Sequence, residues 1–124
     1  MTLIEFLTAR LTEDEAAARF AFADHNDAQP DWYEIRSGAV NLAENEDELI
    51  TFDAGISRHI ARHDPARVLR EVEAKRAIIE LHPVWFGRCE GCGIEVQRPD
   101  GCLTLRALAL AYADHRDYRT EWAP

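Results

Sequence analysis

Three cysteines are the residues in this sequence whose type and spacing best suit chemistry. They are arranged as Cys89-x2-Cys92-x9-Cys102, in a stretch that contains little apolar material of its own. Gly91 and Gly93 permit the tight turn and the close backbone approach by which a Cys-x2-Cys pair holds one metal ion. The pattern predicts a zinc knuckle, in which three thiolates and one further ligand surround the metal.

The fourth ligand must come from outside the cysteine segment. His82 is the first choice, because it ends a predicted helix and only six residues separate it from Cys89. His115, which follows Cys102 after twelve residues, and His63 are the alternatives. We therefore predict one structural zinc ion per chain, bound by His82, Cys89, Cys92 and Cys102. Four protein ligands leave no position for a reactive water, which catalytic zinc requires.

Three other interpretations of the cysteines stay open. A thioredoxin-like redox pair is disfavoured, because the Cys-x2-Cys motif does not open a helix after a strand and Cys102 is left without a role. A structural disulfide fits poorly with an odd number of cysteines in a chain that we expect to be cytoplasmic. The last alternative is that all three are inert residues of the core.

Two clusters of polar residues are weaker candidates for chemistry. His59 and His63 are four residues apart, which is a helical spacing, and Asp64 follows them, so the three could form a second metal site. They lack the glutamate of a His-Glu-x-x-His metalloprotease motif, and exposed histidines at a helix end are the simpler interpretation. Residues 114–117, Asp-His-Arg-Asp, could provide acid–base groups, but polar residues just past a helix more often cap it.

Charge and composition exclude several functional classes. The chain has 124 residues and a net charge of −9, and residues 1–53 hold 13 acidic side chains against three arginines. Such a balance disfavours general binding to nucleic acids or to anionic lipid. The sequence has no glycine-rich phosphate loop, no Gly-x-Ser-x-Gly motif and no apolar run of the roughly 18–20 residues that span a bilayer. Acidic residues stand where a secretory signal would be basic, so we expect a cytoplasmic protein.

The elements that must position the cysteines form a single α+β domain over residues 1–124, with three main helices. Its expected parts are a helix over 1–23, an antiparallel β-meander over 32–52, helices over 54–82, the zinc-knuckle loop over 83–102 and a C-terminal helix over 103–113. A Thr2–Glu5 capping box starts the first helix, and Asp53 and Asp64 are predicted N-caps of the middle helices.

Within this plan, residues 24–31 are polar, end in Pro30 and Asp31, and are expected to form a loop. Residues 83–102 are expected to be irregular, with 94–96 as the only strand-like triplet. The aromatic residues are interpreted as core and hinge packing rather than a surface for stacking bases, given the acidic setting. They include Trp32, Tyr33, Trp85, Phe86, Tyr112, Tyr118 and Trp122.

Two stretches carry a resemblance to a known family. The residues HIARHDPARVLREVEAKR at 59–76, and CLTLRALAL at 102–110 followed by YADHRDY at 112–118, resemble an uncharacterised family of small proteins from actinomycetes and their phages. Members of that family often carry a Cys-x2-Cys pair before the cysteine that opens the last helix, which implies a shared zinc site. Members commonly have a proline where this chain has Ala111, so its last helix is expected to continue through that residue.

The resemblance implies no particular activity. We expect a zinc-stabilised, non-enzymatic accessory or adaptor protein of phage or mobile-element type that acts by binding another protein. One alternative is an acidic nucleic-acid mimic that inhibits a DNA-binding or defence enzyme, which requires the carboxylates of residues 13–48 to form one ordered surface. A small hydrolytic or redox enzyme is the other alternative.

Overall fold

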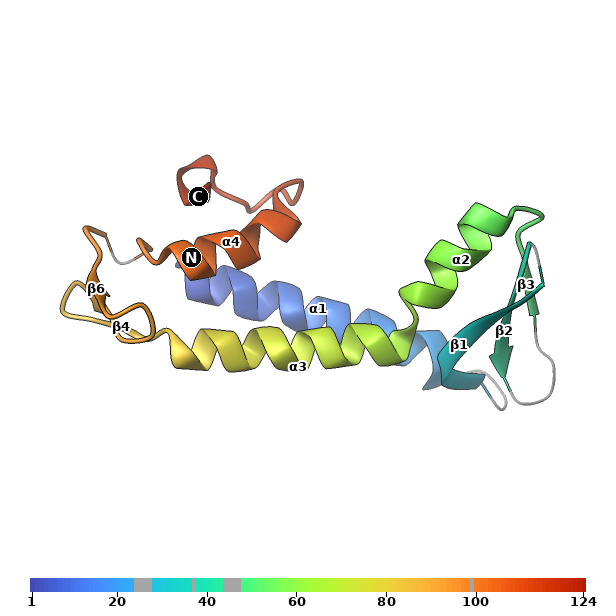
Figure 1. The fold of residues 1–124 in the computed structure, drawn as a ribbon. Helices are drawn as coiled ribbons and strands as arrows, with labels where there is room; N and C mark the ends of the chain where they lie inside the picture. The colour runs from blue at the N-terminus through green and yellow to red at the C-terminus, as the bar shows by residue number, and fades with distance from the viewer. Residues whose placement is uncertain (24–27, 37, 44–47, 99) are drawn as a thin grey trace. The chain divides into compact units, whose positions relative to one another are not determined.

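The computed structural model describes residues 1–23, 28–36, 38–43, 48–98 and 100–124. These residues form four α-helices and two three-stranded antiparallel sheets, which confirms the α+β class (Figure 1). Contacts divide the chain into two compact units: unit 1 comprises Met1–Thr12 and Glu73–Pro124, and unit 2 comprises Glu13–Val72. None of the described helices is long and apolar enough to cross a membrane.

The elements follow one another in this order. They are α1 (Leu3–Ala23), β1 (Ala28–Arg36), β2 (Ala39–Ala43), β3 (Glu48–Ile50), α2 (Ala54–Arg62), α3 (Pro65–Leu81), β4 (Val84–Trp85), β5 (Arg88–Cys89), β6 (Ile94–Glu95) and α4 (Leu103–Ala109), then two 3₁₀ turns, η1 (Leu110–Tyr112) and η2 (Thr120–Trp122). The predicted loop at 24–27 and most of the acidic stretch at 44–48 lie outside the described residues.

The predicted N-caps are present, and each satisfies a backbone N–H that the first helical turn leaves free. Before α1, the Glu5 amide donates to Thr2 Oγ1 (3.1 Å) and the Thr2 amide donates to the Glu5 carboxylate (2.8 Å). The Ile56 amide donates to Asp53 (2.9 Å) and the Arg67 amide donates to Asp64 (2.8 Å). The caps explain why α2 and α3 are separate helices with a break before Pro65.

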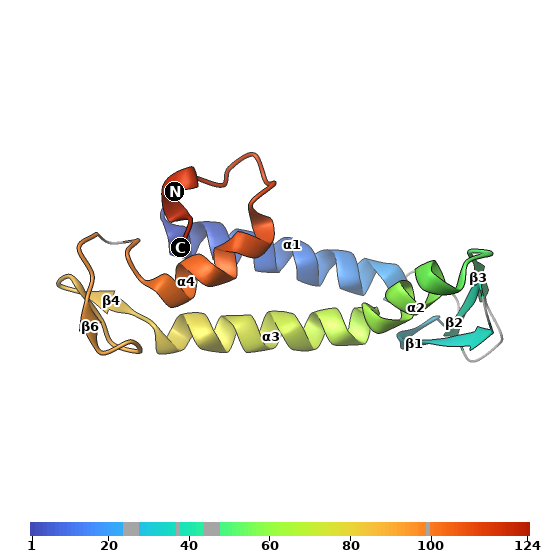
Figure 2. The same ribbon diagram turned by 45° about the horizontal axis from the view of Figure 1, so that its top comes forward.

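The core of unit 1 joins α1 to the C-terminal part of the chain. Its buried residues are Leu3, Phe6, Leu7, Cys89, Val96, Cys102, Leu105, Ala109 and Trp122. Figure 2 shows how the segment after α4 turns back toward the start of α1. Asp100 ties these parts together, because its carboxylate accepts hydrogen bonds from the Leu3 amide (3.0 Å) and the Trp122 indole (3.1 Å). Two of the cysteines, Cys89 and Cys102, thus belong to the buried core of this unit.

Unit 2 contains the meander, with strand order β1-β2-β3, and α2 packs on β1 and β2. β1 begins at Ala28, so the prediction of a loop through Asp31 was wrong for residues 28–31. Pro30 is tolerated there because β1 is an edge strand, and an edge strand has one side on which no backbone N–H must donate.

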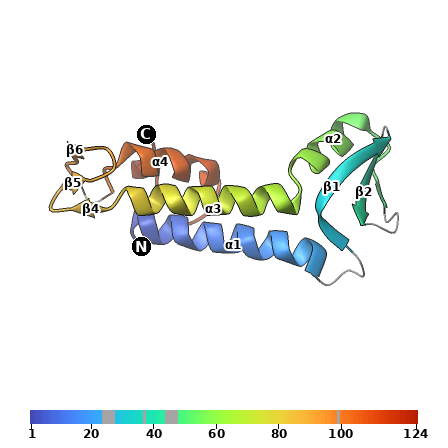
Figure 3. The ribbon, with the colours of Figure 1, turned by 60° about the horizontal axis from the view of Figure 1, so that its bottom comes forward.

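The cysteine segment is more regular than expected. β4, β5 and β6 form a small antiparallel sheet (Figure 3), in which the Phe86-Gly87 turn joins Trp85 to its partner Arg88. Both turn residues have positive φ, 49° and 74°, which suits the right-handed twist of a two-residue hairpin. Trp85 is 60% exposed and Phe86 is fully exposed, so the prediction that they pack in the core was wrong.

Two other sequence predictions also need correction. Tyr33 is 58% exposed on the meander, not a core residue. The last α-helix ends at Ala109 and not at Ala113, because the chain tightens into η1, where the Ala113 amide bonds the Leu110 carbonyl. A final turn with i to i+3 bonds is a common way to satisfy the carbonyls at a helix end.

Candidate metal centre

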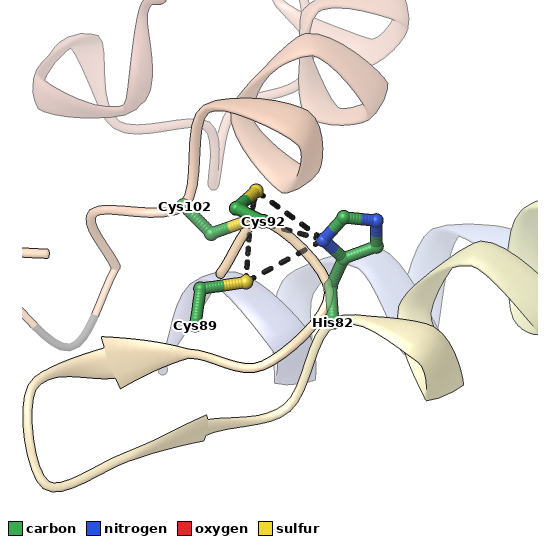
Figure 4. Close-up of side chains that lie close together, drawn as sticks. All are labelled: His82, Cys89, Cys92 and Cys102. Atoms are coloured by element: carbon green, nitrogen blue, oxygen red, sulfur yellow. Dashed lines mark hydrogen bonds between the residues drawn. The ribbon is translucent and has the colours of Figure 1, made fainter. Parts of the chain in front are cut away.

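The structure brings together the four residues His82, Cys89, Cys92 and Cys102 (Figure 4). His82 directly follows α3, Cys89 ends β5, Cys92 lies in the turn between β5 and β6, and Cys102 is the N-cap of α4. The imidazole Nδ1 and the three sulfurs all lie within 4.8 Å of one another. Among the described residues, no other group of three or more potential ligands is this close.

Five of the six separations between these atoms are close to those of a tetrahedral zinc site. His82 Nδ1 lies 3.4 Å from the sulfur of Cys89, 3.5 Å from that of Cys92 and 3.8 Å from that of Cys102. The Cys102 sulfur lies 3.5 Å from that of Cys89 and 3.8 Å from that of Cys92. Bond lengths of about 2.3 Å to sulfur and 2.0–2.1 Å to nitrogen place tetrahedral ligands about 3.8 Å (S to S) and about 3.6 Å (S to N) apart.

These distances also bear on the competing interpretations. All three cysteines are free, and their sulfurs are much further apart than the roughly 2.05 Å of a disulfide bond. Inert core cysteines have no reason to gather around the ring nitrogen of a histidine. The side chains therefore have the arrangement of a metal centre.

Backbone hydrogen bonds hold the knuckle in place. The Gly93 amide donates to the Cys89 carbonyl (2.9 Å), which closes the turn between the two nearby thiols. The Glu90 amide donates to the Pro83 carbonyl (3.0 Å), and this bond connects the turn to the segment that carries His82. These local bonds position His82, Cys89 and Cys92. Cys102 is brought to them by the packing of α4.

The surroundings of the sulfurs differ. A hydrogen bond with the Thr104 hydroxyl, 3.6 Å from the Cys92 sulfur, lowers the pKa of that thiol. Burial raises the pKa of the Cys102 thiol to about 11, although backbone hydrogen bonds from Leu105 and Thr104 oppose the shift. A metal ion must therefore displace a proton from Cys102 when it binds, so metal affinity falls as the pH is lowered.

Thr104 was not singled out from the sequence. Its position in the sequence is nevertheless informative. Thr104 is two residues after Cys102, in the first turn of the predicted last helix, so its hydroxyl is near the predicted metal ligands. Such partners orient the ligands of metal sites and tune their basicity.

The other three histidines that the structure describes are not part of this cluster. His115 lies in unit 1, where its Nδ1 accepts hydrogen bonds from the Arg10 guanidinium (2.9 Å) and the Asp117 amide (3.1 Å). His63 and His59 lie in unit 2 with their rings in contact but tilted by 32°, with 4.3 Å between centroids. Among the described residues they do not form a group of three ligands with Asp64. Among the described histidines, His82 is thus the one that lies beside the cysteines.

Gly91 is essential for this geometry. A Cβ at Gly91 would overlap the Leu81 carbonyl oxygen and would lie 2.6 Å from His82 Nδ1, so Gly91→Ala must displace the imidazole. We expect it to destabilise the protein by about 2–3 kcal/mol. Thermal unfolding with zinc present measures the loss, and chelator competition measures the weaker metal binding.

Gly93→Ala is the matched control. Gly93 has φ of 68°, but a Cβ there meets no atom within 4 Å, so only backbone strain of about 1 kcal/mol is expected. Equal effects of the two substitutions on metal binding would contradict the assignment of His82 as a ligand.

Fold and site together define a small α+β protein with a Cys3His cluster of knuckle type. Over residues 1–124 the sequence matches the family of unknown function DUF6221, and the chain belongs to this family. Neither a curated protein nor a solved structure matches it.

Proposed function

We propose that the protein binds one structural zinc ion through His82 Nδ1 and the sulfurs of Cys89, Cys92 and Cys102. The observation that carries the proposal is the closeness of the four ligand atoms: five of their six separations are 3.4–3.8 Å, and all six are within 4.8 Å, as expected around a single tetrahedral ion. Zinc is preferred over harder divalent ions because thiolate and imidazole ligands suit it, whereas magnesium and calcium prefer oxygen.

A structural role is favoured over a catalytic one. Four protein ligands complete the tetrahedron and leave no open position for water or a substrate. Cys89 and Cys102 are buried, and both belong to the core of unit 1. The ion would therefore join α4 to the β4–β5–β6 sheet and contribute folding energy directly.

We further propose that the zinc-stabilised protein acts without catalysis, as an accessory or adaptor protein that binds another protein. The completed metal shell supports this role, and so do the exposed apolar side chains of unit 1, among them Trp85, Phe86 and Leu103. Large apolar groups at a surface are typical of interaction sites. A phage or mobile-element setting stays a prediction from the sequence resemblance.

The acidic-mimic alternative also stays a prediction. It needs one ordered surface of carboxylates over residues 13–48, and those at 24–27 and 44–47 lie outside the described residues.

Metal content is the test of the proposal. Elemental analysis of protein purified without added metal, together with native mass spectrometry, is expected to give one zinc ion per chain. His82→Ala should lower this occupancy, whereas His63→Ala, a histidine outside the cluster, should not. Metal-free protein with three titratable thiols, even after incubation with zinc, would refute the proposal.

A further inference from the structure

Two arginines of unit 1 share the walls of a surface groove beside the zinc knuckle. Arg98 and Arg106 both line a cavity of about 260 Å³, together with Ile94, Val96, Gly101 and Leu103. β6 provides one wall and the start of α4 the other, and the two elements lie at the same end of unit 1 in Figure 3. None of the four cluster residues lines this groove, so it is a separate feature of the surface.

Arg106 is a buried arginine for which the described residues provide no ion pair. Arg106 is only 9% exposed. Its Nε donates to the Asp100 carbonyl (2.8 Å), and its Nη1 donates to the Ala123 carbonyl (3.4 Å). Among the described residues, no carboxylate forms an ion pair with it. A buried charge without a counter-ion is costly, and an anion in the groove would remove this cost.

The carboxylates nearby are committed elsewhere. Asp100 accepts from the Leu3 amide and the Trp122 indole, and Glu121 lies 3.8 Å from the Arg119 guanidinium. Both acids line a smaller cavity of about 180 Å³, which Arg98 and Arg106 also line. In the larger groove, Glu95 is the one acid among the lining residues, against two arginines. The larger groove therefore has a net positive charge.

The same groove has apolar walls. Ile94 and Leu103 are 52% and 57% exposed, while Val96 is buried beneath them. Gly101 keeps the floor open: a Cβ there would lie 2.9 Å from the Arg98 carbonyl oxygen and 3.0 Å from the Val96 side chain. The groove thus offers aliphatic surface beside two arginine side chains.

We infer that this groove is a docking site for an acidic peptide segment of a partner protein, in which a glutamate or aspartate is flanked by aliphatic residues. The carboxylate contacts Arg98 and Arg106, and the aliphatic neighbours cover Ile94 and Leu103. Arginine pairs with carboxylates through charge-assisted hydrogen bonds, so the peptide carboxylate complements the two arginines in charge and in hydrogen-bonding geometry. The inference rests on the proposed role as a binding protein, and it names the surface used and the chemistry of the partner.

A single carboxylate fits the groove better than a nucleic acid. Glu95 at the groove, and Asp100 and Glu121 at the adjoining cavity, would repel a backbone with a charge at every nucleotide. The net charge of the chain, −9, adds to this repulsion. One acidic side chain between aliphatic neighbours meets both arginines and avoids most of these acids.

The test is an NMR titration of the full-length, zinc-loaded protein. The probe is a short capped peptide with the sequence Gly-Leu-Glu-Leu-Gly, and the comparison is the same peptide with Gln in place of Glu. We expect the Glu peptide to shift the amide signals of Ile94, Gly101 and Leu103 and to bind with a Kd of about 1 mM or below. The Gln peptide should bind about tenfold more weakly.

Two variants separate the groove from the general charge of the protein. Arg98→Gln should raise the Kd of the Glu peptide about tenfold while the melting temperature stays unchanged, because Arg98 is exposed. Arg116→Gln is the matched control: its side chain is 90% exposed, it does not line the groove, and binding should not change. Arg106→Gln is not used alone, because the loss of its bonds to Asp100 and Ala123 could unfold the site.

Four outcomes would overturn the inference. They are equal binding of the Gln peptide, equal shifts with inorganic phosphate, shifts that persist in Arg98→Gln, and a concentration-dependent dimer whose interface covers the groove. The proposed function fails by a different route, through the absence of zinc or of any protein partner. If a partner is captured equally by wild type and Arg98→Gln, the groove is refuted and the binding role stands.

Discussion

Removal of zinc is expected to unfold the segment from His82 to Cys102 and to lower the melting temperature of the protein by roughly 10 °C or more. Structural zinc contributes roughly 10–16 kcal/mol of binding free energy in zinc-finger peptides, and a site of four protein ligands loses all of it when the ion leaves. A loss of even about 3 kcal/mol shifts the melting temperature of a chain of this size by about 10 °C. Circular dichroism with and without a chelator measures the change.

Cys92→Ser gives the same result by another route. Cys92 is only half-buried, so a serine there removes a metal ligand but little core packing. The variant should melt at the temperature of the chelated wild type, and added chelator should then have no further effect. Cys102→Ser is less informative, because Cys102 is 1% exposed and belongs to the core, and its loss affects packing as well.

The control for this experiment is His63→Ala. His63 is exposed and lies in unit 2, so its removal should leave both the melting temperature and the chelator response unchanged. If wild type and Cys92→Ser melt alike, and the chelator affects neither, the cluster holds no structural metal.

Trp122→Ala is expected to destabilise the protein by about 3–5 kcal/mol, the usual cost of truncating a buried tryptophan. Trp122 is 0% exposed. Its ring packs on Phe6, with 5.0 Å between centroids, and on Tyr118, with 6.0 Å. Its indole N–H donates to Asp100, so the substitution also leaves one acceptor of a half-buried carboxylate unpaired. Denaturant unfolding measures the loss.

Trp85→Ala is the matched control, since it makes the same substitution at a residue that is 60% exposed. We expect its free energy of unfolding to fall by no more than about 0.5–1 kcal/mol. Trp122→Phe should give an intermediate loss, because most of the packing stays and the hydrogen bond to Asp100 goes. Similar losses for Trp122→Ala and Trp85→Ala would contradict the description of the core.

Much of the fold follows from local features of the sequence. The capping residues Thr2, Asp53 and Asp64 mark the starts of α1, α2 and α3, and the structure has hydrogen bonds to each of them. Local signals suffice here because a cap acts within three residues of itself. The position of β1 is different. Pro30 marks a loop by local rules, and only the place of β1 at the edge of its sheet makes a strand acceptable.

The candidate site shows the same division. The spacing of Cys89 and Cys92, with Gly91 between them, predicts a knuckle because two ligands so close in sequence need only a turn to meet. The choice among His82, His115 and His63 depends on how distant elements pack. In the structure His82 lies beside the sulfurs, whereas His115 is hydrogen-bonded to Arg10.

The class of fold, the helix starts and the knuckle of Cys89 and Cys92 are predictable from the sequence, since each depends on residues near one another in the chain. Tertiary contacts determine which described histidine joins the cysteines, that Trp122 is buried while Trp85 is exposed, and that Arg106 is buried with no ion pair among the described residues. Burial and pairing of this kind arise from contacts between segments far apart in sequence, and no local pattern encodes them.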